Sequence, residues 1–171
     1  MRGAASDVLI PTGAVIEVTA SVEDAERRID TLGASELYAV STDGQLLGIL
    51  PDYELLKRRL AGDRRRQCVA DVMSPVPLSV RCGTPLSEVA IHMRNGRHQR
   101  IPVVSNGRLV GEVTRRSLLH HLRTCPDDVF VDVGAGVEPT DRSSGAPVAS
   151  PKYLRNCCGA VGEGASPGSG A

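Results

Sequence analysis

The side chains best suited to metal binding or covalent catalysis form no recognisable site in this sequence. The cysteines are odd in number and no two have C-x-x-C spacing: they are Cys68, Cys82, Cys125, Cys157 and Cys158. This pattern indicates neither a disulfide framework nor a zinc site. His120 and His121 are adjacent, so they would diverge on a helix and bind a metal poorly. Neither a G-x-S-x-G motif nor a Gly-rich loop ending in Gly-Lys-Ser/Thr occurs. We therefore predict no catalytic residues, no metal site, no required cofactor and no enzyme activity.

The charge balance and the aromatic content disfavour two classes of partner. The 171 residues include 20 basic and 20 acidic side chains, so no net field would recruit a phosphate backbone or an anionic membrane. The few aromatic residues are scattered, which leaves no platform for stacking bases. Asp7 and Pro11 interrupt the region where a signal peptide needs an apolar core, and no run of 18 apolar residues occurs. We expect a soluble cytoplasmic protein that binds neither nucleic acid nor membrane.

Internal repetition is the strongest organising signal in the chain. When the sequence is compared with itself, the apolar segment 37–40 aligns with 101–104. The second half is one residue shorter than the first at a Gly turn. After this turn the two halves align again at an offset that is smaller by one residue, and 44–50 aligns with 107–113. Because apolar residues meet apolar residues at the buried positions, the pattern indicates a duplicated unit.

Each half is predicted to run strand, helix, strand, tight turn, strand, helix. Ser21 is suited to begin an amphipathic helix, and Asp43-Gly44 and Asn106-Gly107 are typical of hairpin turns. We therefore predict an α/β fold of two βαββα repeats. Each repeat is too small to bury its own sheet, so the two should pack face to face with pseudo-two-fold symmetry. Two equivalent clefts would then lie where strand ends meet helix N-termini.

The composition changes after the second repeat. Of the last 46 residues, 24 are Gly, Ala, Ser or Pro, and the apolar periodicity is lost. We accordingly predict a first repeat over 8–62, a second repeat over 67–123, and a flexible, disordered C-terminal tail over 124–171.

The second half resembles a CBS domain, the module named after cystathionine β-synthase. The resemblance is carried by V-x-D-V-M-S at 69–74, R-I-P-V-V at 100–104, N-G-R-L-V-G at 106–111 and V-T-x-x-S-L-L at 113–119. The first half resembles a more degenerate copy without the opening D-V-M-S. The resemblance implies a tandem pair, often called a Bateman module. Such pairs commonly bind adenosine-containing ligands, such as AMP, ADP, ATP or S-adenosylmethionine, and pass the occupancy to a partner.

The family motif G-x-x-T-x-x-D, at the start of the last helix of each repeat, implies contacts with phosphate and ribose. In the second repeat Thr114 keeps the hydroxyl, while Ser117 replaces the carboxylate. In the first repeat Pro51 replaces the Thr, and Glu54 keeps a carboxylate on a longer stem. A structural interpretation stays open for both: Thr114 can be an ordinary N-cap, and Glu54 a solvated residue of the first turn.

In the family, basic residues just before the second strand of one repeat often contact phosphate in the opposite cleft. His98 and Arg100 have this position, next to Pro102. The resemblance therefore implies that they serve the cleft containing Glu54. Their polar surroundings, the run RNGRHQR, are also typical of a solvated loop.

Ser35 and Glu36 have the same position in the first repeat. They would serve the cleft with Thr114 and Ser117, where Glu36 would repel a phosphate. The cleft with Glu54 is thus the better candidate for nucleotide binding.

Two functions remain open at this stage. The first is a regulatory module that senses an adenosine-containing nucleotide in a cleft between the repeats and modulates an unidentified partner protein. The alternative is a degenerate pair that acts only as a platform for dimerisation or protein interaction. We also predict a homodimer, because the leucines exceed what one small core needs: Leu32, Leu56, Leu60, Leu119 and Leu122.

Overall fold

The computed structural model describes residues 3–62, 67–94 and 98–125, and the predicted tail lies outside them from residue 126 onward. In chain order the elements are α1 (Ala5–Val8), β1 (Val15–Glu17), α2 (Val22–Leu32), β2 (Glu36–Val40), β3 (Leu46–Pro51), α3 (Asp52–Leu60), α4 (Val69–Val72), β4 (Val80–Arg81), α5 (Leu86–Arg94), β5 (Arg100–Ser105), β6 (Arg108–Thr114) and α6 (Arg115–Thr124).

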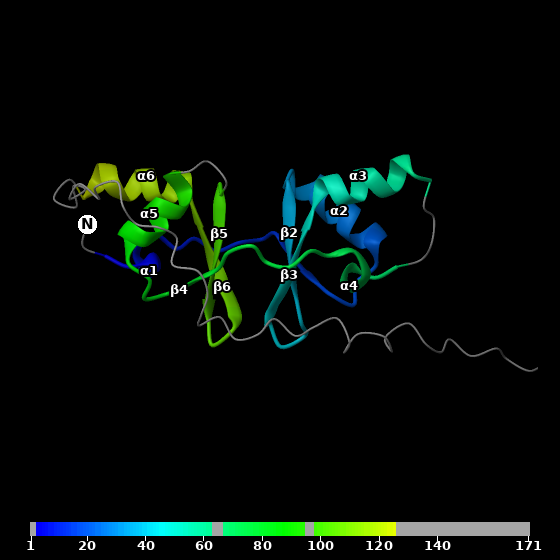
Figure 1. Ribbon diagram of the computed structural model, residues 1–171, viewed down its shortest axis with the longest axis horizontal. Coiled ribbons are helices and arrows are strands. Elements are labelled where there is room, and N and C mark those ends of the chain that lie inside the picture. The colour runs from blue at the N-terminus through cyan, green and yellow to red at the C-terminus, as the bar shows by residue number, and fades with distance from the viewer. Residues whose placement is uncertain (1–2, 63–66, 95–97, 126–171) are drawn as a thin grey trace, which may run out of the picture.

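The strands form two three-stranded sheets with the same topology, ordered β1-β2-β3 and β4-β5-β6. In each sheet the first two strands are parallel and the last two antiparallel. The two hairpins stand side by side at the centre of the molecule, with α2 and α3 outside one sheet and α5 and α6 outside the other (Figure 1). This arrangement confirms the predicted fold of two βαββα repeats.

The pairing registers of the two hairpins are equivalent residue by residue. Tyr38 pairs with Ile49 in the first sheet, and Pro102 pairs with Glu112 in the second. The offsets that align the two halves of the sequence place Pro102 on Tyr38 and Glu112 on Ile49, as the sequence repeat predicts. The same alignment relates Glu36 to Arg100.

The short helices α1 and α4 are exchanged between the repeats. Residues of α1 lie in the core of the second repeat, and Val69 of α4 lies in the core of the first. Backbone bonds hold this exchange, because the N–H of Ala5 donates to the carbonyl oxygen of Thr84 (2.8 Å) and the N–H of Val69 to that of Ala20 (2.9 Å).

The helix α1 also corrects the description of the first repeat. The side chain of Asp7 accepts from the N–H of Ala4 (2.9 Å), just as Asp71 accepts from the N–H of Cys68 (3.0 Å). The offset that aligns β2 with β5 also places Asp7 on Asp71. The first repeat therefore retains the Asp-Val of the opening motif at Asp7 and Val8, while Leu9 and Ile10 stand where the second repeat has Met-Ser. The interpretation that the whole opening is missing is corrected in its first half only.

After each short helix the chain crosses onto the last strand of the opposite repeat. Ile10 exchanges two backbone bonds with Glu112 (2.9 Å each), and Ser74 exchanges two with Ile49 (2.8 and 2.9 Å). A glycine lies beside each crossing. A Cβ on Gly48 would come within 2.8 Å of the Ser74 carbonyl oxygen. Only glycine permits this approach without displacing the crossing strand.

The predicted caps and turns are largely present. The Ser21 hydroxyl accepts from the N–H of Asp24 (3.0 Å) and begins α2. In the hairpin turns Gly44, Asn106 and Gly107 have positive φ, whereas Asp43 does not. The two turns bond to each other as well, since the N–H of Leu46 donates to Gly107 (3.0 Å). The sheets are thus tied together at one end.

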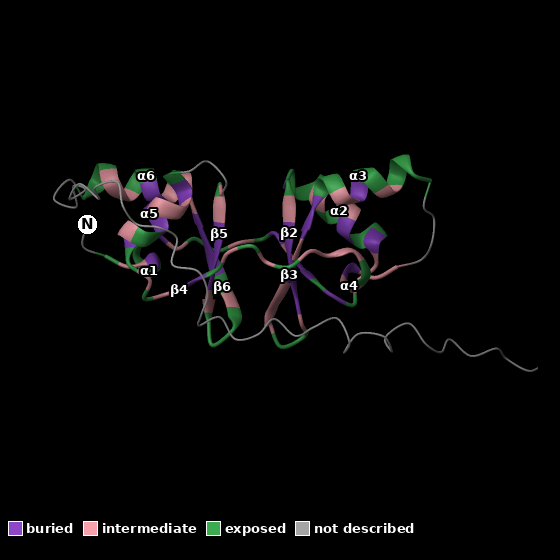
Figure 2. Ribbon diagram, in the orientation of Figure 1, coloured by how far each residue is buried: buried purple, intermediate pink, exposed green. Residues whose placement is uncertain are grey.

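Each repeat has its own apolar core between its sheet and its helices (Figure 2). By contrast, leucines on the outer helices remain exposed, by 45% at Leu32, 57% at Leu56, 79% at Leu60 and 61% at Leu119. Leu122 is only partly buried and packs on the second core. Four of the five leucines named in the dimer prediction are therefore surplus to the core.

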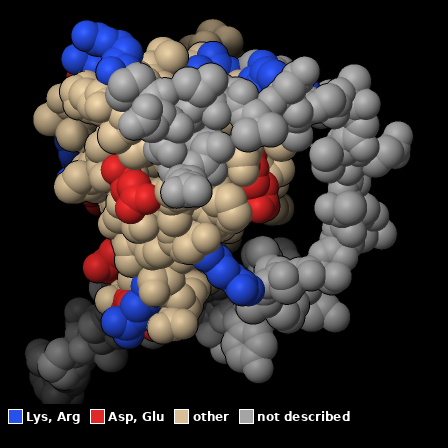
Figure 3. Space-filling model, turned by 90° about the vertical axis from the view of Figure 1, so that its left-hand side faces the viewer, with Lys and Arg blue, Asp and Glu red and all other residues tan. Residues whose placement is uncertain are grey.

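Two negative findings concern the described residues. None of their helices is both long and apolar enough to cross a membrane. No group of three or more His, Cys, Asp or Glu side chains in the same residues is arranged to hold a metal ion. On the face shown in Figure 3, basic and acidic side chains both occur, some of them next to each other, and neither sign covers the whole face.

Candidate functional site

A cavity of about 420 Å³ lies between the two sheets and is lined by both repeats. Its walls are formed by Ser35, Glu36, Tyr38, Ile49, Val76, Pro77, Leu78, His98, Gln99, Arg100 and Pro102. Apolar side chains come from the crossing segment 76–78 and from the central strands. Charged and polar side chains come from the residues that begin β2 and β5.

The pseudo-symmetry of the repeats explains why a space exists here. On one side of the axis the Tyr38 hydroxyl donates to the Glu112 carboxylate (3.0 Å), and both residues are buried. The equivalent pair on the other side is Pro102 and Ile49, and both line the cavity. A proline and an isoleucine cannot reach across as a tyrosine and a glutamate do. The cavity therefore lies where the smaller, apolar pair is found.

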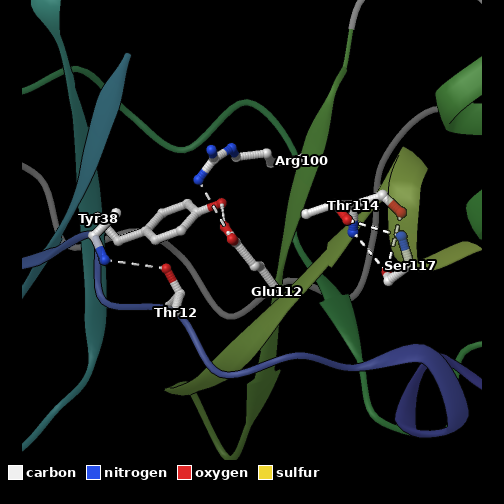
Figure 4. Close-up of polar contacts among 7 residues, drawn as sticks. Thr12, Tyr38, Arg100, Glu112, Thr114 and Ser117 are labelled. Carbon is white, nitrogen blue, oxygen red and sulfur yellow. Dashed lines mark hydrogen bonds and ion pairs between the residues drawn. The ribbon is translucent and has the colours of Figure 1, made fainter. Parts of the chain in front are cut away.

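Tyr38, Glu112 and Arg100 form one polar bridge between the repeats (Figure 4). Besides the tyrosine hydroxyl, the Glu112 carboxylate faces the Arg100 guanidinium at 3.4 Å. The Glu112 side chain is 6% exposed and that of Arg100 37%. Burial, followed by the charge of Glu112, raises the pKa of the Tyr38 phenol above its usual range. Tyr38 thus remains a hydrogen-bond donor at any physiological pH.

Glu36 is the second carboxylate of this region and lines the cavity itself. Burial raises its pKa from the ordinary value of 4.5. The positive charge of Arg100 opposes this shift, and the negative charges of Glu112 and Asp52 reinforce it. Arg100 therefore shares its charge between two carboxylates.

Three of the predicted site residues line this cavity: His98, Arg100 and Pro102. The other three do not. Glu54 forms an ion pair with Lys57 (2.7 Å) in the first turn of α3. Thr114 and Ser117 cap α6 reciprocally, since each hydroxyl accepts from the backbone N–H of the other (3.0 and 3.1 Å). The interpretation of Thr114 as an N-cap is confirmed, and ligand contacts by these residues stay predictions.

The structure also reassigns Ser35 and Glu36. The resemblance implied that they lie in the cleft opposite to that of His98 and Arg100, but all four line the same cavity. That placement was wrong, because residues that begin β2 and β5 approach each other near the axis. The alignment of the two halves makes Glu36 and Arg100 equivalent positions. This equivalence is the signal that could have predicted that they lie near the axis in one cavity. Tyr38 and Glu112 carried no comparable signal.

Comparison with known proteins gives one family and a consistent set of relatives. Residues 69–124 match the family model of the CBS domain. The chloroplastic CBS domain-containing protein CBSX1 of Arabidopsis thaliana is 25% identical over 134 residues, covering 61% of this chain and 57% of the relative. This chain thus spans a little over half the length of that protein.

Solved structures extend the likeness to the first repeat. A crystal structure of CBSX2 in complex with AMP is 26% identical with a TM-score of 0.62, and the match covers 73% of this chain and 99% of that one. CBSX2 from Arabidopsis thaliana, described as a CBS-pair protein, gives 25% and 0.64, covering 75% and 100%.

A third structure shares the fold at lower identity. The CBS domain pair of protein MJ0100, in complex with 5′-methylthioadenosine and S-adenosyl-L-methionine, is 20% identical with a TM-score of 0.56. The match covers 71% of this chain and 96% of that one.

Proposed function

Because the chain carries a tandem pair of CBS domains, we propose that it is a regulatory module that binds an adenosine-containing ligand between its repeats and modulates a partner protein. The observation that carries this proposal is the cavity of about 420 Å³ lined by both repeats. Its size suits a nucleoside. Complexes of CBSX2 with AMP and of the MJ0100 pair with S-adenosyl-L-methionine support the same ligand class.

The walls of the cavity suggest how such a ligand would lie. Ile49, Leu78 and Pro102 offer apolar surface to a flat purine ring. Arg100 and Glu36, which begin the facing strands β5 and β2, would meet the polar end of the ligand. A ligand held this way touches both repeats, so its binding would favour one relative position of the two sheets over others.

The same geometry implies one ligand per chain. Tyr38 and Glu112 contact each other where a second, symmetry-related ligand would need space. Both side chains are almost fully buried and bonded, so vacating that position would leave buried polar groups unpaired. We therefore expect a stoichiometry of one.

Calorimetry with AMP, ADP, ATP and S-adenosylmethionine tests the proposal directly. We expect saturable heat with at least one of them, at one ligand per chain. Ile49→Trp should abolish this heat by filling the cavity. The matched control is Val110→Trp, because Val110 is 43% exposed and does not line the cavity. If neither these four ligands nor adenosine or 5′-methylthioadenosine gives heat, or if Ile49→Trp folds and still binds normally, the proposed site is refuted.

The alternative function, a platform for dimerisation without a nucleotide, is favoured by a separate observation. Exposed leucines lie on α2, α3 and α6, and Tyr53 on α3 is also 54% exposed. Soluble monomeric proteins rarely expose large contiguous apolar patches, and where such a patch occurs it often marks a site of protein interaction. We propose a homodimer through these helices. Sedimentation should then give twice the chain mass, and Leu56→Arg with Leu119→Arg should give the monomer. A monomeric wild type at micromolar concentration would contradict the dimer.

The remaining parts of the proposed function concern what the protein does not do and where it acts. We propose no catalysis, no required cofactor and no nucleic-acid or membrane partner, in keeping with the regulatory character of CBS pairs. We also propose a cytoplasmic location, although the curated relative CBSX1 is chloroplastic. The identity of the regulated protein is a matter for affinity capture with and without ligand.

A further inference from the structure

The charges around the cavity do not suit a phosphate group well. Glu36 lines the cavity directly, and the Glu112 carboxylate lies behind the Arg100 guanidinium at 3.4 Å. Arg100 is thus occupied by a buried carboxylate before any ligand arrives. Glu36 and Glu112 bring two negative charges to this region against the one positive charge of Arg100.

The surroundings of Glu36 include two further carboxylates. Burial is the main cause of its raised pKa; the charge of Arg100 opposes the shift, and the charges of Glu112 and Asp52 add to it. An anion bound in the cavity would be repelled by the charges of Glu36 and Glu112. To bind Arg100, a phosphate would also have to compete with Glu112, which is buried and cannot turn to water instead.

We propose that Glu36 is a specificity-determining residue, which selects adenosine ligands with a neutral or cationic 5′ substituent over ligands with 5′ phosphates. The inference rests on the proposed function and names the ligand class of the same cavity. A sulfonium or amine near Glu36 gains a charge-assisted contact, which is stronger than a neutral one. A phosphate at the same place meets a like charge, which disfavours binding.

The position of Glu36 in the repeat strengthens the argument. Its equivalent in the second repeat is Arg100. The two strand starts that face the cavity therefore carry opposite charges rather than a pair of cations. At the polar end of the cavity an anion would have to share Arg100 with Glu112, while Glu36 at the same end is suited to a cation.

The test compares five ligands by calorimetry at pH 7.5: adenosine, 5′-methylthioadenosine, S-adenosylmethionine, AMP and ATP. The wild type should bind the first three more tightly than AMP or ATP. Glu36→Gln should strengthen AMP binding by about tenfold or more, weaken S-adenosylmethionine binding by a similar factor, and leave adenosine within about threefold. Glu17→Gln is the matched control, since Glu17 is an exposed glutamate on β1 and does not line the cavity. It should change none of these affinities.

The outcomes separate the two proposals. If adenosine or any other ligand binds in the cavity but Glu36→Gln leaves the AMP affinity unchanged, the charge selection is wrong while the proposed function stands. If the wild-type protein binds AMP or ATP more tightly than adenosine, the charge selection is likewise wrong while the proposed function stands. If neither the wild type nor Glu36→Gln gives heat with any of the five, both proposals fail. A thermal unfolding midpoint of the variant that is no lower than that of the wild type establishes that any loss is not due to misfolding.

Discussion

Replacing Tyr38 by Phe removes the hydroxyl that joins the two repeats, and its cost can be estimated from the structure. The hydroxyl donates to Glu112 at 3.0 Å, and the two residues are 1% and 4% exposed. A hydrogen bond to a charged group contributes about 1.5–3 kcal/mol, because the buried carboxylate has no water to replace the lost donor. With a urea m-value of about 2 kcal/mol/M, Tyr38→Phe should lower the unfolding midpoint by about 1 M.

A double-mutant cycle makes this prediction specific. Glu112→Ile gives the second sheet the residue found at the equivalent position of the first, Ile49. Alone it should also destabilise, since it leaves the Tyr38 hydroxyl buried without its acceptor. Combined with Tyr38→Phe it should cost much less than the sum, because both partners are then apolar.

The measurement is urea unfolding followed by far-UV circular dichroism, with equal m-values required for the comparison. Tyr53→Phe is the matched control, because Tyr53 is 54% exposed and its loss of a hydroxyl should cost less than about 0.5 kcal/mol. The reasoning is refuted if Tyr38→Phe costs no more than this control, or if the two single changes simply add in the double variant.

Two further predictions concern stability. Gly48→Ala should lower the free energy of unfolding by about 1–3 kcal/mol in the urea assay, because the added Cβ would come within 2.7 Å of the Met73 sulfur and close to the crossing backbone. Gly13→Ala is the control. Its Cβ would meet no atom within 4 Å, so this variant should be nearly neutral. Glu36→Gln should stabilise the protein at pH 7, because the pKa of the Glu36 carboxyl is raised on folding. Such a group lowers the free energy of unfolding as the pH rises from about 4.5 through the raised pKa. In thermal unfolding the advantage of the variant should therefore vanish near pH 4, and an advantage that grows toward acid pH would contradict the prediction.

The fold was predictable because short-range sequence patterns specify the elements of each repeat. The N-cap at Ser21 and the Gly turns act within a few residues of chain, and the apolar register fixes which strands are equivalent. The exchange of α1 and α4 was not predictable in this way. Asp7 caps its short helix identically whichever repeat the helix packs against, so the sequence pattern carries no information on the choice. Asp7 itself could have been found by extending the alignment of the two halves to the start of the chain.

The candidate site was predictable only in part, for a different reason. His98, Arg100 and Pro102 belong to a motif and line the cavity. The assignment of Glu36 failed because a cleft near a pseudo-two-fold axis receives residues from both repeats. Which side chains meet there depends on how the sheets face each other, and no local pattern specifies that. The bond between Tyr38 and Glu112 spans 74 residues and is a property of the packed pair.

The difference between the repeats has a consequence for how a sensor can work. In an exactly duplicated pair the two clefts would be equal, so both would be open to a ligand or both would be filled. Here Tyr38 and Glu112 fill one side with a buried, bonded contact, while Pro102 and Ile49 leave the other side open. Arg100 belongs to both sides, because it lines the cavity and pairs with Glu112. A ligand that draws the guanidinium toward the cavity would leave the Glu112 carboxylate with the Tyr38 hydroxyl as a side-chain partner. Arg100 thus links the open side of the pair to the residue that accepts the hydrogen bond between the repeats.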